Sequence, residues 1–324
     1  MQDFASRLTL WQRRHGRRGL PWQGTRDPYR IWLAEVMLQQ TQVAAVIPYY
    51  ERFLARFKHL KHLAAASQDE VLRLWSGLGY YARGRNLHAA AKAIAEQGAF
   101  PKTMEGIQAL PGIGRSTASA IAVFAFGRRA AILDGNAKRV FARCFGVEGE
   151  KRQWELAETL LPSRGMRAYT QALMDLGATV CTRANPACAA CPVAADCVAR
   201  RTGRIAELPA PRARRPLPLR RASWFVYVEG GKVLLERRPN SGLWGGLWAF
   251  PETPLFAVPK PRKLAPLEHG FTHFRLRAQP LLCALRKAPP RAEAPGRIWL
   301  DVADAVGAAV PAPVRAVLKG LAPA

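Results

Sequence analysis

Residues 110–121 read LPGIGRSTASAI, a stretch that predicts two helices joined by a tight turn. Gly112 and Gly114 permit backbone angles that other residues rarely adopt, so successive N–H groups of the turn can point outward together. The apolar helix expected from Ser116 onward adds the positive end of its dipole. From Leu110 to Ser116 the stretch therefore predicts an anion-binding hairpin, with a plain helix-to-helix turn as the alternative.

The net charge favours an anionic partner for this hairpin. The 324 residues include 49 Lys and Arg against 23 Asp and Glu, which gives a formal net charge of +26. A charge of this size favours nucleic acid over a membrane surface, and such a hairpin can hold one phosphate without reading base sequence. The chain has no apolar run of roughly 18 residues and no signal-peptide core, so we expect a cytoplasmic protein with no membrane partner.

Hydrophobic periodicity divides the chain into three parts. Residues 1–199 show helical spacing throughout, in segments such as DEVLRLWSGL and RNLHAAAKAIAEQG. Residues 200–221 contain eight Arg, four Pro and one Glu and are expected to form a basic, semi-extended linker. Residues 222–324 predict an α+β domain. It should contain the hairpin WFVYVEGGKVLLERRP, the strand-like FTHFRLRAQPLLCAL and the closing helix VRAVLKGL.

Four of the six cysteines are close together in CTRANPACAACPVAADC. Cys181, Cys188, Cys191 and Cys197 are separated by six, two and five residues, whereas Cys144 and Cys283 stand alone and are expected to be ordinary buried thiols. Zinc ribbons usually pair two CxxC units across a longer gap, and only one CxxC is present here. The spacing favours a [4Fe–4S] cluster, with tetrahedral zinc as the alternative.

Two carboxylates are placed in contrasting surroundings. Asp27 and Pro28 begin a helix in which Glu35 has mostly apolar neighbours, so burial should favour the protonated acid, unless Glu35 lies on a solvated face. Asp134, in ILDGNAKRV, begins another helix, whose N–H groups should keep it ionised. Lys138, one turn later, is a candidate ion-pair partner for it. Acid-assisted cleavage of a glycosidic bond requires such a pair, with one group donating a proton and the other stabilising a cationic sugar.

Five motifs occur in an order that resembles a known family: WLAEVMLQQTQV, GLGYYARGRNL, LPGIGRSTASAI, ILDGNAKRV and the cysteine loop. Together they resemble the A/G-mismatch adenine DNA glycosylases of the MutY family, over nearly the whole chain. The resemblance implies a mainly α helix-hairpin-helix glycosylase region with an iron–sulfur loop and a C-terminal α+β Nudix-like domain. It also implies a monomeric, nucleoid-associated bacterial enzyme. Its expected partner is double-stranded DNA carrying adenine opposite 8-oxoguanine or guanine.

The same resemblance implies roles for individual residues. Glu35 would protonate adenine and later assist water, while Asp134 would stabilise the oxocarbenium-like sugar, with Asn136 and Tyr80 as supporting groups. Gln40 and Tyr80 would enter the base stack as adenine is flipped out, since the bond is inaccessible in a stacked duplex. The residues expected to contact the DNA or the flipped base, apart from those, are Trp22, Leu38, Val43, Leu110, Gly112, Gly114, Ser116, Lys138 and Gln171. Some family members carry Glu at the position of Gln171, whose amide can still bind adenine.

Ser116 separates this chain from the related endonuclease III enzymes, which carry a lysine nucleophile at that position. A hydroxyl cannot form the Schiff base, so we expect a glycosylase without strong strand-cleaving activity, although Lys138 could be trapped adventitiously by an abasic sugar. The alternatives are a pyrimidine- or thymine-specific glycosylase of the same superfamily and a non-catalytic helix-hairpin-helix DNA-binding protein.

The C-terminal region resembles a Nudix domain through SGLWGGLWAFPE. Catalytic Nudix enzymes need several metal-binding Glu on one helix, but Glu252 is the only acidic residue from Gly242 to Leu267. The resemblance therefore implies binding of 8-oxoguanine rather than hydrolysis. Thr272 and His273, in FTHF, are the residues expected to recognise 8-oxoguanine. Ser is more usual in the family where Thr272 stands.

Overall fold

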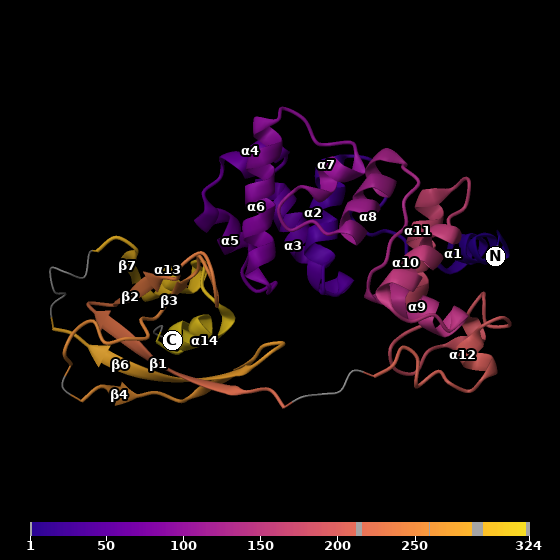
Figure 1. Cartoon of the computed structure of the whole chain (residues 1–324). Coiled ribbons are helices and arrows are strands. Elements are labelled where there is room, and N and C mark those ends of the chain that lie inside the picture. Colours follow the sequence, from indigo (N-terminus) through magenta and orange to yellow (C-terminus); the bar gives the residue numbers. More distant parts are fainter. Residues whose placement is uncertain (1, 212–215, 259, 287–293, 322–324) are drawn as a thin grey trace. The chain divides into compact units, whose positions relative to one another are not determined.

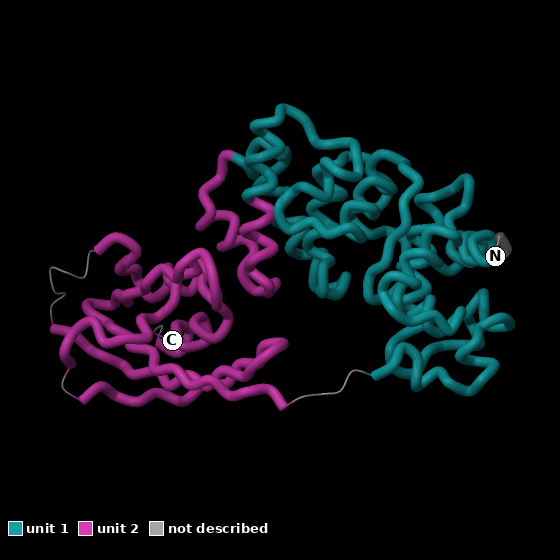
Figure 2. Tube along the Cα trace, in the orientation of Figure 1, with its two compact units in different colours: residues 1–64, 89–213 teal, residues 65–88, 214–324 magenta. Residues whose placement is uncertain are grey.

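The computed structural model describes residues 2–211, 216–258, 260–286 and 294–321 (Figure 1). The chain divides into two compact units (Figure 2). The first contains residues 1–64 and 89–213, and the second contains residues 65–88 and 214–324. The boundaries predicted at 199 and 221 stay predictions, and residues 212–215 of the predicted linker lie outside the described residues.

The first unit is helical, as the sequence predicts. Its elements are α1 (Gln2–His15), α2 (Pro28–Leu38), α3 (Val43–Arg56), α4 (Leu60–Ala65), which ends at the boundary of the unit, the later part of α6 (Tyr81–Glu96), α7 (Met104–Gln108), α8 (Arg115–Phe126), α9 (Gly135–Phe145), α10 (Glu150–Thr159), α11 (Met166–Asp175), the π-helical turn η1 (Leu176–Val180), the 3-10 turn η2 (Cys188–Ala190) and α12 (Val198–Arg201).

Two of these helices begin at the caps that the sequence predicts. The Asp27 carboxylate accepts a hydrogen bond from the Tyr29 N–H at 2.9 Å and starts α2. The Asp134 carboxylate accepts one from the Ala137 N–H at 2.7 Å and starts α9. Each side chain satisfies an amide that would otherwise lack a partner in the first helical turn.

The hairpin between α7 and α8 depends on one of its two glycines. Gly112 has φ +78°, in the left-handed region that L-residues avoid. Gly114, the N-cap of α8, has φ −88°, so the turn does not require glycine there for its backbone angle.

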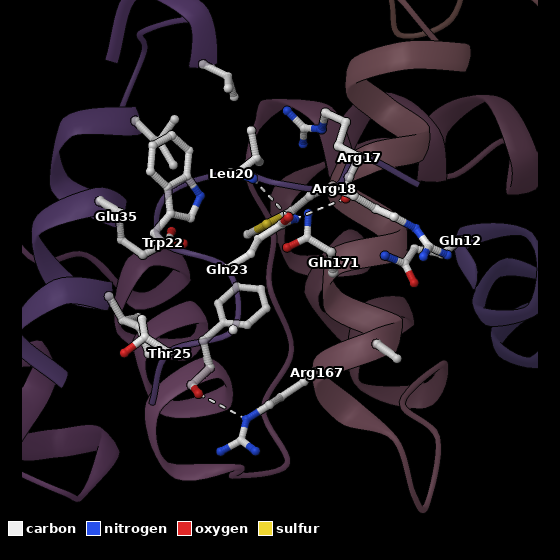
Figure 3. Close-up of a pocket in the computed structure, with 18 of the residues that line it drawn as sticks. Gln12, Arg17, Arg18, Leu20, Trp22, Gln23, Thr25, Glu35, Arg167 and Gln171 are labelled. Atoms are coloured by element: carbon white, nitrogen blue, oxygen red, sulfur yellow. Dashed lines mark hydrogen bonds between the residues drawn. The ribbon is translucent and has the colours of Figure 1, made fainter. Parts of the chain in front are cut away.

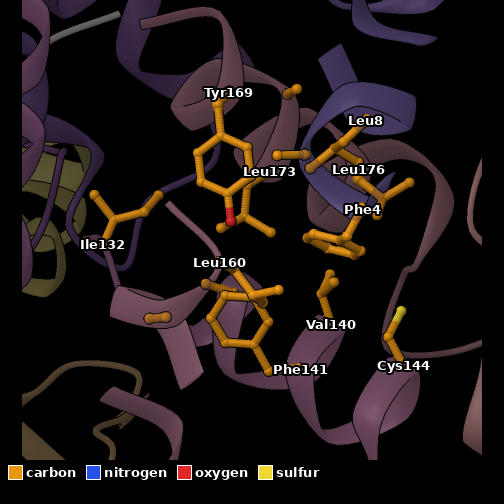
Figure 4. Packing of buried hydrophobic residues seen from close by; sticks show 14 of the residues in the cluster. Phe4, Leu8, Ile132, Val140, Phe141, Cys144, Leu160, Tyr169, Leu173 and Leu176 are labelled. Atoms are coloured by element: carbon orange, nitrogen blue, oxygen red, sulfur yellow. The ribbon is translucent and has the colours of Figure 1, made fainter. Parts of the chain in front are cut away.

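The core of the first unit lies where α1, α9 and α11 meet (Figure 4). Phe4 and Leu8 from α1, Phe141 from α9 and Leu173 from α11 are buried together. This core anchors the start of α9, where Asp134 lies.

The second unit is an α+β domain with one seven-stranded sheet among its described residues. The strands are β1 (Leu219–Glu229), β2 (Lys232–Arg237), β3 (Trp248–Ala249), β4 (Arg262–Lys263), β5 (Leu267–Gly270), β6 (Arg275–Ala284) and β7 (Arg297–Asp301). The helices are α5 (Gln68–Trp75), the earlier part of α6, α13 (Val302–Gly307) and α14 (Ala312–Leu321). The main order is β3-β2-β1-β6-β4, with β7 paired to β2 and β5 to β6. β1 runs parallel to β6.

The predicted hairpin, strand and closing helix of this domain are confirmed. β1 and β2 are antiparallel, with Val228 opposite Val233, and Gly230 and Gly231 have φ +53° and +79°. Positive φ at both central residues is the geometry that matches the twist of a two-residue hairpin. The strand expected in FTHFRLRAQPLLCAL is β6, and VRAVLKGL lies in α14.

Residues 65–88 pack as part of the second unit. The Ser76 hydroxyl donates to the Val310 carbonyl at 2.7 Å, and Arg85 donates to the Gly245 carbonyl at 2.6 Å. Leu72 belongs to the same buried cluster as Trp224. Among the described residues, no helix is both long and apolar enough to cross a membrane.

Candidate active site

A cavity of about 590 Å³ opens in the first unit between α2 and α11 (Figure 3). Trp22, Leu38, Val43 and Gln171, all expected to contact the base, line it together with Glu35. Five arginines also line it: Arg13, Arg17, Arg18, Arg26 and Arg167. Glu35 is the one carboxylate among the described residues that line it, so the cavity combines an apolar face, a cationic rim and a single acid.

Glu35 faces this cavity from the apolar helix α2. Ile31 and Ala34, its neighbours on the helix, are buried and line the same cavity. Burial, with a smaller contribution from the negative charge of Asp134, raises the pKa of Glu35 to about 8. The predicted shift toward the neutral acid is therefore present in the structure, and the contribution of Asp134 shows that the two carboxyls are close enough to interact.

Asp134 differs from the prediction in one respect. Burial raises the pKa of Asp134 above its ordinary value, because the loss of water outweighs the hydrogen bonds from the Ala137 and Asn136 N–H groups and the attraction of Arg139. The helix N–H groups oppose the shift but do not reverse it. Lys138 pairs with Glu150 at 3.2 Å, so it is not the ion-pair partner of Asp134.

Asn136 is held by residues that the sequence did not single out. Arg139 donates to the Asn136 side-chain oxygen and to the Gly177 carbonyl, both at 2.7 Å, and to the Cys181 carbonyl at 2.8 Å. Gly177 lets η1 approach closely, because a Cβ atom there would lie 2.6 Å from the Asn136 Cβ. The i, i+3 spacing of Asn136 and Arg139 could have indicated the contact between these two side chains. The contacts of Arg139 with residues 177 and 181 depend on tertiary packing.

The hairpin is attached to α2 and to the segment before Asp134. The Gln39 amide donates to the Thr117 hydroxyl at 3.2 Å and to the Gly112 carbonyl at 3.4 Å. The Ser116 hydroxyl accepts from the Leu133 N–H at 3.0 Å. Gly112 and Gly114 are exposed, as an anion-binding turn requires, whereas Leu110 is buried beneath them.

Gln40 and Tyr80, the residues expected to enter the base stack, share an unusual backbone. Gln40 has φ +55° and Tyr80 has φ +48°, and both side chains are exposed, Tyr80 by 46%. Non-glycine residues in this region carry strain that is found mostly at functional positions. Gln40 follows α2 in the first unit and Tyr80 precedes α6 in the second, so a shared role beside the cavity stays a prediction.

Known proteins resemble this chain in sequence over almost its whole length. The HhH-GPD superfamily of base excision DNA repair proteins matches residues 33–162, and the NUDIX domain family matches residues 223–320. The adenine DNA glycosylase of Buchnera aphidicola subsp. Baizongia pistaciae is 32% identical over 97% of this chain and 95% of its own length. The Mus musculus adenine DNA glycosylase is 34% identical over 98% of this chain and 77% of its own length. The chain belongs to the adenine DNA glycosylase family.

Solved structures agree with this assignment at the level of the fold. A thermostable thymine-DNA glycosylase is 31% identical, with a TM-score of 0.58, and covers 62% of this chain and 96% of its own. An endonuclease III–DNA complex, 20% identical with a TM-score of 0.55, shows the shared helical fold. The predicted family and fold class are therefore confirmed.

In this adenine DNA glycosylase family member, the four clustered cysteines line one small cavity. Cys181, Cys188, Cys191 and Cys197 surround it and form no disulfide. Arg143, which is buried, donates to the carbonyls of Thr182 and Leu208 and lies 3.6 Å from the Cys181 sulfur. Among the described residues, no group of three or more His, Cys, Asp or Glu is arranged to hold a metal ion.

Cys144 also lines this small cavity. The sequence did not indicate this, because Cys144 lies far from the four clustered cysteines along the chain. A hydrogen bond from the Cys144 thiol is the largest cause that lowers the pKa of Cys197 to about 6. Burial raises the pKa of Cys191 to about 11. Cys144 is buried as predicted, but it is not an isolated thiol. Cys283 is also buried, in the second unit.

In the second unit, Thr272 and His273 form the exposed tip of a tight turn between β5 and β6. The Phe271 N–H donates to the Phe274 carbonyl at 2.8 Å, and the rings of these two residues stack with centroids 4.4 Å apart. Thr272 and His273 contact each other at 3.3 Å. Glu252 pairs with Arg238 at 3.1 Å, and the described residues of 242–267 include no helix, so the metal-binding helix of a Nudix hydrolase is missing from this part.

Proposed function

We propose that this chain is a base-excision-repair enzyme that flips out and removes adenine mispaired with 8-oxoguanine or guanine. The observation that carries the proposal is a cavity in which Glu35, with a pKa of about 8, is the one described carboxylate, close enough to Asp134 for their charges to interact. At neutral pH such an acid holds a proton that it can donate. The family, the apolar cavity face and the net charge of +26 all support a flipped base of duplex DNA as the substrate.

The proposed reaction begins with adenine extruded into the cavity, against Trp22, Leu38 and Val43. Glu35 transfers its proton to an adenine ring nitrogen, and the bond between the sugar C1′ and adenine N9 breaks with its electrons going to the base. The Asp134 carboxylate stabilises the cationic sugar. Water then adds to C1′ as the Glu35 carboxylate takes up the proton, which restores the enzyme. Asn136, held by Arg139, supports this geometry.

A panel of duplexes tests the proposal. A:8-oxoguanine, A:G, T:G and oxidised-pyrimidine duplexes are incubated with the chain, and free base is measured. We expect adenine to be released from the first two alone, and Glu35→Gln to bind the duplexes without excision, because an amide cannot donate that proton. Turnover by the variant, or release of another base, would overturn the assignment.

A thymine-specific glycosylase is the second candidate, because the thymine-DNA glycosylase of known structure is 31% identical to this chain. That likeness covers 62% of this chain, and the relatives that match both units are adenine DNA glycosylases. The T:G duplex in the panel distinguishes the two.

We further propose that the reaction is monofunctional. Ser116 stands where endonuclease III enzymes carry their nucleophilic lysine, and its hydroxyl is engaged with the Leu133 N–H. Borohydride trapping with an A:8-oxoguanine duplex should therefore give little covalent complex, and any trapped species should disappear in Lys138→Ala. Strong trapping that survives this substitution would contradict the proposal.

We also propose that the four clustered cysteines hold a [4Fe–4S] cluster. Four thiols around one cavity fit a multi-iron group, and the single CxxC unit differs from the paired CxxC units of a zinc ribbon. The bound group would hold the loop from Cys181 to Cys197 in place. Absorption spectra and metal analysis of the purified protein test this, and stoichiometric zinc without iron would contradict it.

The second unit is proposed to read 8-oxoguanine through Thr272 and His273. These two residues lie at an exposed turn that the stacked rings of Phe271 and Phe274 hold together, and this position supports the role. Thr272→Ala with His273→Ala should reduce the preference for A:8-oxoguanine over A:G more than it slows A:G cleavage. An unchanged preference would remove the turn from this role.

A further inference from the structure

Asp175, at the end of α11, is a fully buried carboxylate behind the cavity wall, with an exposed fraction of 0%. Three donors surround it. The Arg17 Nε lies 2.7 Å from Oδ1, the Arg17 backbone N lies 3.0 Å from Oδ2, and the Gln171 Nε2 lies 2.8 Å from Oδ1. Arg17 and Gln171 both line the cavity, whereas Asp175 does not.

This network determines which end of the Gln171 amide points away from Asp175. A carboxylate paired with a guanidinium can only accept hydrogen bonds, so the Gln171 NH₂ group must be the end that faces it. The amide oxygen of Gln171 is then the end available to a ligand, and among the described residues it has no hydrogen-bond partner in the structure. In Figure 3 the Gln171 side chain lies between the arginines of one wall and the Trp22 and Glu35 side.

We propose that Asp175 is a positioning residue that makes Gln171 act as a hydrogen-bond acceptor only, and that this selects the flipped base. The inference rests on the proposed function. Adenine presents an amino group at C6, which is a donor, whereas guanine and hypoxanthine present an oxygen at the same place, which is an acceptor. An acceptor-only Gln171 pairs with the amino group and leaves two oxygens facing each other when the base carries a carbonyl.

Without a carboxylate at position 175, the glutamine amide loses this constraint. In Asp175→Asn, the amide oxygen can keep the hydrogen bond from the Arg17 backbone N–H, and the NH₂ group then takes the Oδ1 position, where it faces both Gln171 and the Arg17 Nε–H. Gln171 can then rotate and present its NH₂ group to the cavity, where it suits a carbonyl rather than an amino group. Buried polar groups that lose or mismatch a partner discriminate strongly between substrates, so the expected effect is large.

Single-turnover release from A:8-oxoguanine and hypoxanthine:8-oxoguanine duplexes tests the proposal. The quantity compared between variant and parent is the ratio of the two rates. Any general loss of folded enzyme cancels within each ratio, and the different leaving abilities of the bases cancel between the two enzymes. We expect Asp175→Asn to lower this ratio by roughly tenfold or more, mainly by slowing adenine release. Gln171→Met, which removes the amide at similar volume, should lower the ratio as well, and adding Asp175→Asn to it should cause no further change.

Glu207→Gln is the matched control, because Glu207 is an exposed carboxylate paired with Arg204 and lies outside the cavity. It should leave the ratio as in the parent chain. Equal slowing of both duplexes by Asp175→Asn and by Gln171→Met would show a merely structural role and overturn the inference. Should Asp175→Asn fail to fold, an unchanged ratio in Gln171→Met alone would also overturn it. A parent chain that releases no adenine would instead overturn the proposed function, and this inference with it.

Discussion

The hydroxyl oxygen of Ser116 accepts a hydrogen bond from the backbone N–H of Leu133, with 3.0 Å between the oxygen and the nitrogen. Leu133 is buried and directly precedes Asp134. The second helix of the hairpin therefore holds the segment that brings the Asp134 carboxylate to the start of α9. Ser116, whose hydroxyl cannot form a Schiff base, thus makes a structural contact in this chain.

Ser116→Ala should destabilise the chain by about 1–2 kcal/mol, because it leaves the Leu133 N–H without its partner. Ser116→Thr retains a hydroxyl and should preserve most of the stability. Urea denaturation of both variants measures the difference. An Ala variant as stable as the parent would show that another group or water replaces the hydroxyl at no cost.

Glu35→Gln should stabilise the folded state, increasingly so as the pH rises. The folded carboxyl has a pKa of about 8 against an ordinary value of 4.5, so the folded state binds its proton more tightly than the unfolded chain between these pH values. The free energy of unfolding of the parent therefore falls across that range, by up to about 5 kcal/mol, and levels off above it. Denaturation at pH 5, 6.5 and 8 measures the gap between variant and parent, and a gap independent of pH would contradict the assignment.

Excision should be fastest between two pH limits. Glu35 must be protonated, so the single-turnover rate should fall by about tenfold per pH unit above about 8. Asp134 must be ionised, and because burial raises the pKa of Asp134, the acidic limb should begin above the ordinary value of 3.8. Duplex binding measured at each pH serves as the control. A rate that stays constant from pH 7 to 9.5 would exclude Glu35 as the acid.

Gly177→Ala should destabilise the first unit by about 1–3 kcal/mol and slow excision, because the added methyl would lie 2.6 Å from the Asn136 Cβ. Gly320→Ala, in α14, is a matched control, since a Cβ there meets nothing within 4 Å. That variant should be neutral or more stable by up to about 1 kcal/mol, as expected for alanine in a helix. Thermal denaturation compares them, and equal behaviour would show that α9 and η1 can separate without cost.

With the proposed [4Fe–4S] cluster, Arg143→Leu should lower the iron content per chain and the melting temperature. The buried guanidinium donates to the carbonyls of Thr182, Arg183 and Leu208, which would lose their donor. Arg201→Leu, at an exposed position on α12, provides a control of equal charge change. Iron analysis and absorption spectra report the result, and full iron loading of the Leu variant would show that the loop holds its shape without Arg143.

Local patterns in the sequence were sufficient for much of the fold. Asp27 and Asp134 cap helices as their residue types predict, and the Gly-Gly pair forms the two-residue hairpin between β1 and β2. Turn and cap chemistry acts over a few residues, so it can be read from neighbouring positions. The association of residues 65–88 with the C-terminal unit could not be read this way, because it depends on contacts such as Ser76 with Val310.

In the candidate site, too, some features could be read from the sequence and others depend on tertiary contacts. The apolar helix around Glu35, the motifs and the four clustered cysteines were visible in the order of the residues, and they predicted the family, which is confirmed, and the acid, which stays a prediction. Tertiary structure alone brought Asp134 close enough to interact with Glu35, paired the buried Asp175 with Arg17 and brought Cys144 to the cysteine loop. The partners in each of these contacts lie far apart in the sequence. The orientation of a hydrogen bond and the size of a pKa shift are decided by surrounding atoms that only the folded chain brings together.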